Sequence, residues 1–151
     1  MISWTYKGID IAKRRPETYG FVYLNTYSDG TMYVGKKNFF SIRTKKPLKN
    51  GNNRDGGKFF NKIVNHKVKQ MEMVISENDW RDYKGSSKKT KALTLIKREI
   101  LQVYIDSINL SFGEYEWMIK LDVLRSDMYH NDNIGGKFFK GRIKKEITEG
   151  F

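Results

Sequence analysis

A short turn between two β-rich runs is the strongest constraint on how this chain folds. The runs at residues 21–24 and 31–34 are rich in aromatic and β-branched residues, and Ser28-Asp29-Gly30 separates them. Runs of this kind around an Asp-Gly turn predict an antiparallel hairpin. Tyr23 lies in the first run and Tyr33 in the second. We therefore expect two phenols close together on neighbouring strands.

Two interpretations of this tyrosine pair remain open. Aromatic pairs across strands are common in sheets for packing alone. The pair is followed, however, by Lys36, Lys37 and Arg43 and then by a long basic segment. Positive charge of this kind suits a phosphate-facing surface better than a buried one.

The charge of the chain indicates its class of partner. The 151 residues carry a formal net charge of +12 at pH 7, and residues 36–69 contain eleven Lys or Arg and one acid, Asp55. A protein this basic is drawn to polyanions at long range. Phenylalanines interleave the basic segment, which favours nucleic-acid contact. The basic residues that we predict to bind nucleic acid are Lys36, Lys37, Lys45, Lys46, Arg54, Lys58 and Lys137.

Composition excludes several classes of protein. Hydrophobic residues make up 38% and charged residues 30%, as in a folded domain. The absence of cysteine excludes a disulfide framework, a thiolate metal site and a cysteine nucleophile. No apolar run has the length of a membrane span and no signal-peptide pattern is present, so we expect a cytoplasmic protein without membrane contact.

We expect the chain to divide into an N-terminal extension at residues 1–18, a main domain at 19–134 and a basic C-terminal tail at 135–151. After the hairpin, residues 38–44 are expected to form a helix or helical turn that brings Arg43 back toward the sheet.

The middle of the chain gives weaker signals. Residues 49–58 are rich in Gly, Asn and charge and predict an exposed loop. Residues 59–68 have apolar positions near helical spacing, and residues 71–75 predict a short strand. Ser86 or Ser87 is well placed to cap a helix. Residues 90–105 fit either helix or strand, and we favour a short helix followed by a central strand.

An amphipathic helix is predicted between Leu110 and Leu124. Glu114 falls on its apolar stripe, where a carboxylate is expensive unless it binds a cation or a hydrogen-bond donor. Glu116 points about 200° further around the helix, so the two acids should not act as a pair. A second interpretation stays open for either acid, because the helix dipole favours acids near the helix start.

The chain resembles the GIY-YIG nuclease family. The two halves of the family signature are matched by Phe21-Val22-Tyr23 and Tyr33-Val34-Gly35. The first triplet departs from the signature, because Phe21 stands in place of the leading glycine and Gly20 precedes it. The later Trp80, Tyr83 and Gly85-Ser86-Ser87 resemble the phage-encoded free-standing homing endonucleases of the Seg type within that family.

This resemblance spans roughly residues 19–134 and implies both a fold and an activity. The implied fold is α/β, with a small, mainly antiparallel central sheet flanked by helices. The implied activity is divalent-metal-dependent hydrolysis of phosphodiester bonds by a DNA endonuclease of phage homing or genome-targeting type. Double-stranded DNA is the expected partner, Mg²⁺ or Mn²⁺ the cofactor, and a monomer or homodimer on DNA the working state.

The resemblance also implies site residues with distinct roles. They are a general base, Tyr23; a group that orients the water or the phosphate, Tyr33; a phosphate ligand, Arg43; a metal ligand, Glu114; and a residue that fixes the site by hydrogen bonds, Asn131. A phenol with a pKa of about 10 is a poor base at neutral pH. We therefore expect Lys36 or Lys37 to favour the phenolate form of Tyr23.

Two alternatives are kept open. Glu116 fits the metal-ligand spacing of intron-encoded relatives, although we favour Glu114. The altered first triplet and the large positive charge also fit a non-catalytic nucleic-acid-binding protein on the same scaffold. Metal-dependent cleavage separates an enzyme from such a binder.

Overall fold

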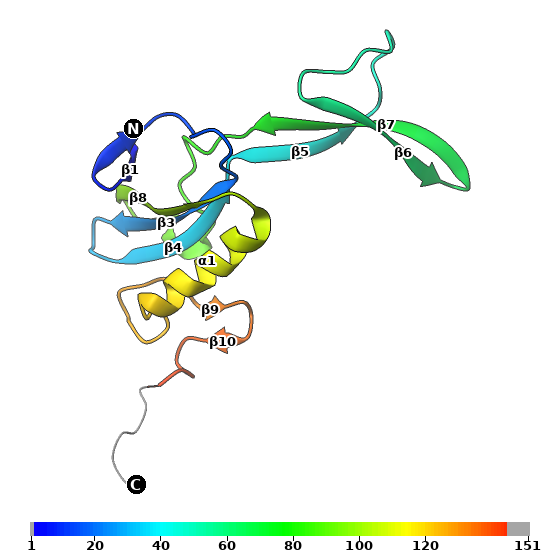
Figure 1. The fold of residues 1–151 in the computed structure, drawn as a ribbon. Helices are drawn as coiled ribbons and strands as arrows, with labels where there is room; N and C mark the ends of the chain where they lie inside the picture. The colour runs from blue at the N-terminus through cyan, green and yellow to red at the C-terminus, as the bar shows by residue number, and fades with distance from the viewer. Residues whose placement is uncertain (1, 145–151) are drawn as a thin grey trace. The chain divides into compact units, whose positions relative to one another are not determined.

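The computed structural model describes residues 2–144 and divides into two compact units. The main unit contains residues up to 38 and from 81 onward, and the ribbon unit contains residues 39–80. Figure 1 shows the elements of both units.

The main unit is built on a five-stranded sheet in the order β2-β1-β8-β3-β4. Its strands are β1 (Trp4–Tyr6), β2 (Ile9–Ile11), β3 (Gly20–Tyr27), β4 (Met32–Asn38) and β8 (Leu95–Tyr104). All neighbouring strands are antiparallel except β1 and β8, which are parallel. The predicted α/β fold with a mainly antiparallel central sheet is confirmed.

The predicted hairpin forms β3 and β4. In the turn, the backbone N–H of Tyr27 donates to the carbonyl of Thr31 at 2.9 Å, and Gly30 adopts a φ of 85°. This left-handed conformation is open to glycine without strain. The Asp29 carboxylate accepts hydrogen bonds from the Thr31 N–H and hydroxyl at 2.9 and 2.6 Å, which fixes the turn. The local signal Ser-Asp-Gly was therefore sufficient to predict this hairpin.

The predicted helix is α1 (Ser107–Lys120), which packs against β3 and β4. The Asp106 side chain caps its first turn by accepting a hydrogen bond from the Asn109 N–H at 2.7 Å. The helix ends earlier than residue 124, because Asp122 takes a left-handed φ of 54° and the Val123 N–H donates to the Met118 carbonyl at 3.1 Å. This is a Schellman-type end.

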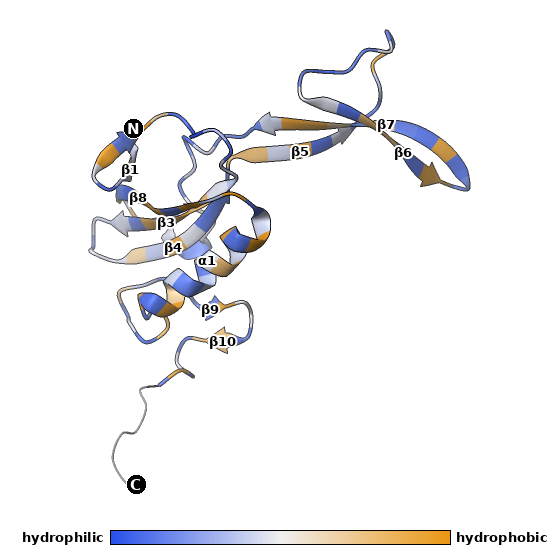
Figure 2. Ribbon diagram, in the orientation of Figure 1, coloured by the Kyte–Doolittle hydropathy of each residue, from blue (hydrophilic) through white to orange (hydrophobic). Residues whose placement is uncertain are grey.

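One face of the sheet and α1 enclose the main core. Val22 and Val34 from the sheet meet Leu110 and Met118 from α1, and Val123 lies just beyond the helix. Because side chains alternate along a strand, Tyr23 and Tyr33 project from the opposite face. Figure 2 shows the mixture of apolar and polar positions that results along these elements.

The N-terminal residues are part of the sheet. A boundary after residue 18 is expected from the sequence, but β1 pairs with β8 over Trp4–Tyr6 and Trp4 is only 1% exposed. The Trp4 ring packs edge-on against Phe21 at 4.9 Å between centroids. Burial of the Trp4 indole against Phe21 is favourable, so this segment packs as part of the main unit and not as a detached extension.

The C-terminal region carries a short antiparallel pair, β9 (Asn133–Ile134) and β10 (Phe138–Phe139). Of the tail expected at residues 135–151, residues 145–151 lie outside the described residues. Lys140 is held inward, because its ammonium donates to the carbonyls of Val123, Ser126 and Tyr129 at 3.0, 2.6 and 2.8 Å.

The ribbon unit is a three-stranded antiparallel sheet in the order β5-β7-β6. Its strands are β5 (Phe40–Lys45), β6 (Gly57–Val64) and β7 (Lys67–Glu77). The helices expected at residues 38–44 and 59–68 are therefore wrong. The expected strand at residues 71–75 is confirmed within β7.

Residues 40–45 form a strand rather than a helix because they pair with β7, which lies well separated from them in the sequence. Alternating residues of β5, such as Phe40, Ile42 and Thr44, fit a strand once β7 provides its partner. Within residues 90–105 the expected strand is confirmed as part of β8, but the expected short helix is absent, and the 3-10 helix η1 (Lys88–Thr90) ends where this range begins. Among residues 2–144, no helix is long and apolar enough to cross a membrane.

Candidate active site

Two strands bring the predicted tyrosines together. In the register of β3 and β4, Tyr23 lies opposite Gly35 and Tyr33 lies opposite Asn25, so the two tyrosines form a diagonal pair on one face. Their ring centroids are 6.3 Å apart. Tyr23 is 1% exposed, whereas Tyr33 is half-buried.

The glycine of the second triplet makes room for the first tyrosine. A Cβ atom at Gly35 would lie 2.4 Å from the Tyr23 hydroxyl oxygen, well inside van der Waals contact. The Tyr23 ring therefore lies directly over Gly35. The two halves of the motif form one structural unit.

Aromatic rings surround Tyr23 on its other sides. Its ring lies 5.4 Å from Trp4 and 6.0 Å from Tyr83, both in edge-on arrangements. Phe21, which replaces the leading glycine of the first triplet, is fully buried in the same group. The departure from the signature thus fills space beside Trp4 and leaves the Tyr23 hydroxyl opposite Gly35.

The pKa of Tyr23 lies well above its ordinary value, first because the phenol is desolvated and then because Tyr83 and Tyr33 lie close by. The expectation that Lys36 or Lys37 favours the phenolate is therefore wrong for the protein alone. Lys36 projects toward α1, where its ammonium lies 2.7 Å from the Ser111 hydroxyl. The Lys37 ammonium lies 4.2 Å from the centroid of the Tyr83 ring.

Glu114 faces a cleft from α1. Burial raises the pKa of its carboxyl, while the Lys36 charge and a hydrogen bond from the Lys36 backbone oppose that rise. Glu116, two residues on, is exposed and does not line the cleft. The geometry therefore favours Glu114 over Glu116 as the acid of this site.

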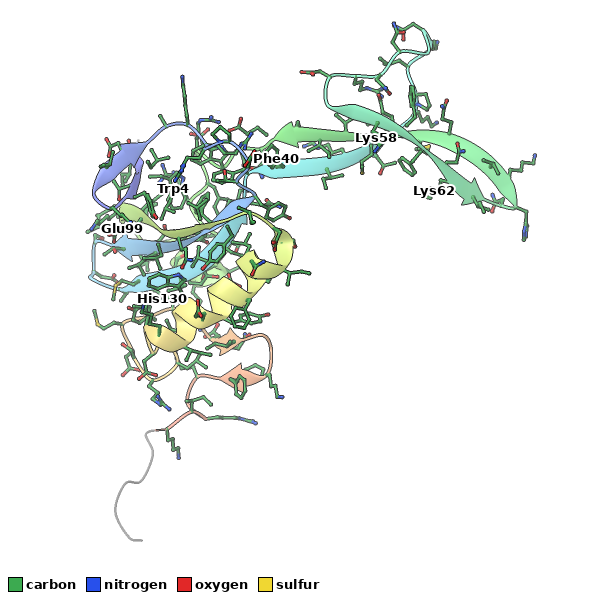
Figure 3. All side chains as sticks on the ribbon, viewed as in Figure 1. Trp4, Phe40, Lys58, Lys62, Glu99 and His130 are labelled. Atoms are coloured by element: carbon green, nitrogen blue, oxygen red, sulfur yellow. The ribbon has the colours of Figure 1, made fainter. Side chains whose placement is uncertain are left out.

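The cleft has a volume of about 510 Å³. Residues from β4, α1 and the segments around η1 and β9 line it, among them Tyr33, Lys89, Glu114, His130, Asn131 and Asp132. Figure 3 labels His130 beside the sheet. The His130 ring nitrogen Nε2 lies 2.6 Å from the Thr31 hydroxyl. These polar groups line an open cleft whose volume exceeds that of a phosphate group.

The outer edge of β4 is closed by the segment that carries Asn131. Met32 exchanges backbone hydrogen bonds with this segment, donating to Met128 at 2.7 Å and accepting from His130 at 2.9 Å. Two residues along, the Asn131 side chain bonds both backbone groups of Val34. Asn131 is thereby buried, with 3% of its surface exposed.

Several residues in or beside the cleft were missed as site residues from sequence. Ser86 forms a side-chain hydrogen bond with Tyr33, which opposes the increase that burial makes in the pKa of that phenol. Ser87, Lys88 and Lys89 line the cleft, and the Lys89 ammonium pairs with the Asp132 carboxylate. The sequence marked Gly85-Ser86-Ser87 as part of the family resemblance and as a possible helix cap, but not as a site. Ser87 precedes η1 without a side-chain capping bond.

The structure does not place Arg43 in this cleft. Arg43 lies exposed on β5 of the ribbon unit, opposite Val74, so the predicted helical return is absent. Its catalytic role stays a prediction.

The other basic residues predicted to bind nucleic acid fall into two groups. Arg54 pairs with the buried Glu72 and also donates to the Lys46 carbonyl at 2.9 Å, so its guanidinium holds the ribbon unit together. Exposed side chains remain at Lys45, Lys46, Lys58 and Lys137. These four are still available for contact with a phosphate backbone.

A divalent ion would find one well-placed carboxylate here. No group of three or more His, Cys, Asp or Glu residues able to hold a metal occurs in the part of the chain that the structure describes. Glu114 offers carboxylate oxygens, the ligands that Mg²⁺ prefers, and Mg²⁺ commonly keeps several waters and binds substrate phosphates. The cleft therefore fits an ion held by one protein carboxylate, with water and substrate completing its ligands.

Comparison with protein families gave a match over most of the chain. Residues 4–134 match the family model described as "Putative endonuclease segE, GIY-YIG domain". The matched range begins in β1 and ends in β9, so it contains the tyrosine pair, Glu114 and Asn131. The comparisons with curated proteins and with solved structures each gave no match.

Proposed function

The chain belongs to the GIY-YIG nuclease family, and on that premise we propose that it is a divalent-metal-dependent endonuclease acting on double-stranded DNA. One observation carries the proposal. Tyr33 from the sheet, Glu114 from α1 and Asn131 from the closing segment line one cleft of the main unit, and the buried Tyr23 ring lies 6.3 Å from that of Tyr33.

Hydrolysis of a phosphodiester needs a water to attack phosphorus, a base to take its proton, and stabilisation of the departing 3′ oxygen. In the proposed reaction, a P–O bond to the water oxygen forms while the bond to the 3′ oxygen breaks. The phenolate form of Tyr23 is the proposed base, which becomes the neutral phenol when it receives the water proton, and the 3′ oxygen takes a proton from solvent. Tyr33, at the cleft, orients the water or the phosphate.

The remaining cleft residues have supporting roles. Glu114 is the proposed ligand for Mg²⁺ or Mn²⁺, which when bound polarises the phosphate and offsets charge on the leaving oxygen. Lys88 and Lys89 line the same cleft and supply positive charge toward a phosphate. Asn131 positions β4, and with it Tyr33, through its bonds to Val34. Arg43 remains a candidate phosphate ligand from the ribbon unit.

The resemblance to Seg-type enzymes also suggests a source and a biological role for the proposed nuclease. It supports a phage-encoded enzyme of homing or genome-targeting type, working in the host cytoplasm as a monomer or homodimer on DNA.

The second candidate is a non-catalytic DNA-binding protein on the same scaffold. The raised pKa of Tyr23 favours it, because a buried neutral phenol is a poor base at neutral pH. Phe21 in place of the leading glycine is a further departure from the family signature.

Incubation of the purified protein with supercoiled plasmid and with linear duplex separates the two candidates. With Mg²⁺ or Mn²⁺ we expect nicked or linear product, and with EDTA we expect none. Binding to both DNAs without cleavage in either metal would reject the enzyme and leave the binder.

A further inference from the structure

The ribbon unit narrows to two strands at one end. β5 pairs with β7 only over Glu72–Glu77, whereas β6 continues to pair with β7 as far as Val64 and Lys67. Residues 60–71 therefore form a two-stranded hairpin, here called the distal hairpin. Its turn residues Asn65 and His66 have φ values of 49° and 62°, as in a type I′ hairpin turn.

One face of this hairpin is strongly basic. Paired residues share a face, so Lys62 and Lys69, which lie directly opposite each other, project together. Alternation along the strands adds Lys67 to the same face, and Lys58 continues this face along β6 just outside the hairpin. The apolar Phe60, Val64 and Met71 lie between these lysines on the same face. We call the four lysines the lysine face. Figure 3 labels Lys58 and Lys62 along β6.

Nothing within the described residues balances this charge. Residues 56–71 contain no acid, and none of the four lysines takes part in an ion pair within residues 2–144. Like charges directly opposite each other destabilise a strand pair. Every residue from 60 to 70 is exposed, so no packed core compensates. The Lys62–Lys69 pair therefore weakens the free hairpin and becomes favourable when an anion lies against it.

We propose that the distal hairpin is a DNA-docking element that lies in the major groove with its lysine face toward the duplex. The choice of duplex DNA as the anion rests on the proposed function. The major groove, about 12 Å wide, admits a two-stranded β-ribbon. β5 pairs with β7 no further than Glu72, so residues 60–71 are a two-stranded ribbon of this kind. The ammonium groups meet phosphates along the groove, so the element binds duplexes of many sequences.

The opposite face of the hairpin provides a matched control. Asn61 lies directly across from Gln70, and both side chains project away from the lysine face. The Asn61→Ala, Gln70→Ala double variant changes an opposed pair at neighbouring positions without changing charge.

Charge swaps at the lysine pair test the proposal with two readouts that move in opposite directions. Lys62→Glu and Lys69→Glu each create a Lys–Glu pair across the strands, whereas the double variant restores like charges. We expect slower amide exchange over residues 60–71 in each single variant and a return toward wild type in the double variant. Affinity for a duplex of mixed sequence should fall in each single variant and fall further in the double.

The Lys62→Gln, Lys69→Gln variant measures how many phosphates the pair neutralises. The slope of log affinity against log salt concentration should become shallower by about 0.9 for each phosphate that the variant no longer neutralises. Affinity and slope unchanged from wild type would overturn the proposal. A fall in affinity of the Asn61, Gln70 variant that matches the fall in the lysine variants would overturn the assignment of the lysine face.

Binding is measured in EDTA, which keeps this test separate from the proposed catalysis. Weaker binding by the lysine variants, in a protein that never cuts, would support the docking element and reject the nuclease. Cleavage by wild type together with unchanged binding by the lysine variants would support the nuclease and reject the docking element.

Discussion

The Asn131 side chain takes the place of a neighbouring strand for Val34. Its Oδ1 atom accepts the Val34 N–H at 3.0 Å, and its Nδ2 atom donates to the Val34 carbonyl at 2.8 Å. Val34 stands between Tyr33 and Gly35, so this amide fixes β4 within the second triplet of the family signature.

Replacement of Asn131 tests this role. Asn131→Asp keeps an acceptor for the Val34 N–H but sets a buried carboxylate against the Val34 carbonyl. We expect a loss of about 2–4 kcal/mol in the free energy of unfolding, because the variant buries charge without a partner. Asn131→Ala should lose about 1–3 kcal/mol. Urea unfolding measures both, and an unchanged midpoint in the Asp variant would show that Asn131 does not hold this edge.

Tyr23 predicts how cleavage depends on pH. Because the pKa of Tyr23 is raised, the phenolate fraction at neutral pH is very small. As long as the pH stays below the pKa, the fraction grows about tenfold for each unit by which the pH rises. If the phenolate is the base, single-turnover cleavage should rise with this slope across neutral and mildly alkaline pH. Tyr23→Phe should remove the rise along with most of the rate. A flat profile in wild type would assign proton removal to another group.

The hydrogen bonds of Lys140 indicate that part of the basic C-terminal region stabilises the fold. Its ammonium donates to three carbonyls around the loop after α1, so Lys140→Met leaves these partly buried groups without a donor. We expect a loss of about 1–3 kcal/mol in the free energy of unfolding.

Lys137→Met is the matched control for Lys140→Met. Lys137 is exposed, so its replacement should change the free energy of unfolding by less than about 0.5 kcal/mol. Thermal unfolding of the two variants checks the pair. Equal stability of both would show that the three hydrogen bonds of Lys140 contribute little.

The parts of the fold that sequence predicted are those decided by local chemistry. Ser28-Asp29-Gly30 specifies its own turn, and the turn fixes which residues of β3 and β4 face each other. The period of α1 likewise identified Glu114 on an inward stripe, although the exact helix end depended on the left-handed Asp122.

The ribbon unit shows where local patterns fail. The apolar residues of β6 are spaced near the period of a helix, so residues 59–64 fit either structure by themselves. Pairing with β7 decides the outcome, and β5 joins that sheet from much earlier in the chain. The helical turn expected around Arg43 is wrong for this reason.

The cleft is only partly readable from sequence for a related reason. Tyr83 and Ser86 come from irregular chain before β8, and Lys89 comes from the short helix η1; no period or turn signal in the sequence predicts which way these side chains face. Their positions beside Tyr23, Tyr33 and Asp132 arise from the assembled main unit.

Cleavage by Glu114→Gln, compared with Glu116→Gln, is the decisive measurement for a nuclease site built around Glu114. Burial raises the pKa of Glu114, so its charged form costs stability once the pH rises above that pKa. The neutral glutamine should therefore fold at least as well as wild type at neutral pH. Measured with Mg²⁺ on plasmid DNA, Glu114→Gln should lower the cleavage rate by roughly 10²-fold or more. Its DNA binding should remain unchanged, and Glu116→Gln should cut like wild type. If Glu114→Gln cut at the wild-type rate and Glu116→Gln lost cleavage, the assignment of the metal to Glu114 would be contradicted.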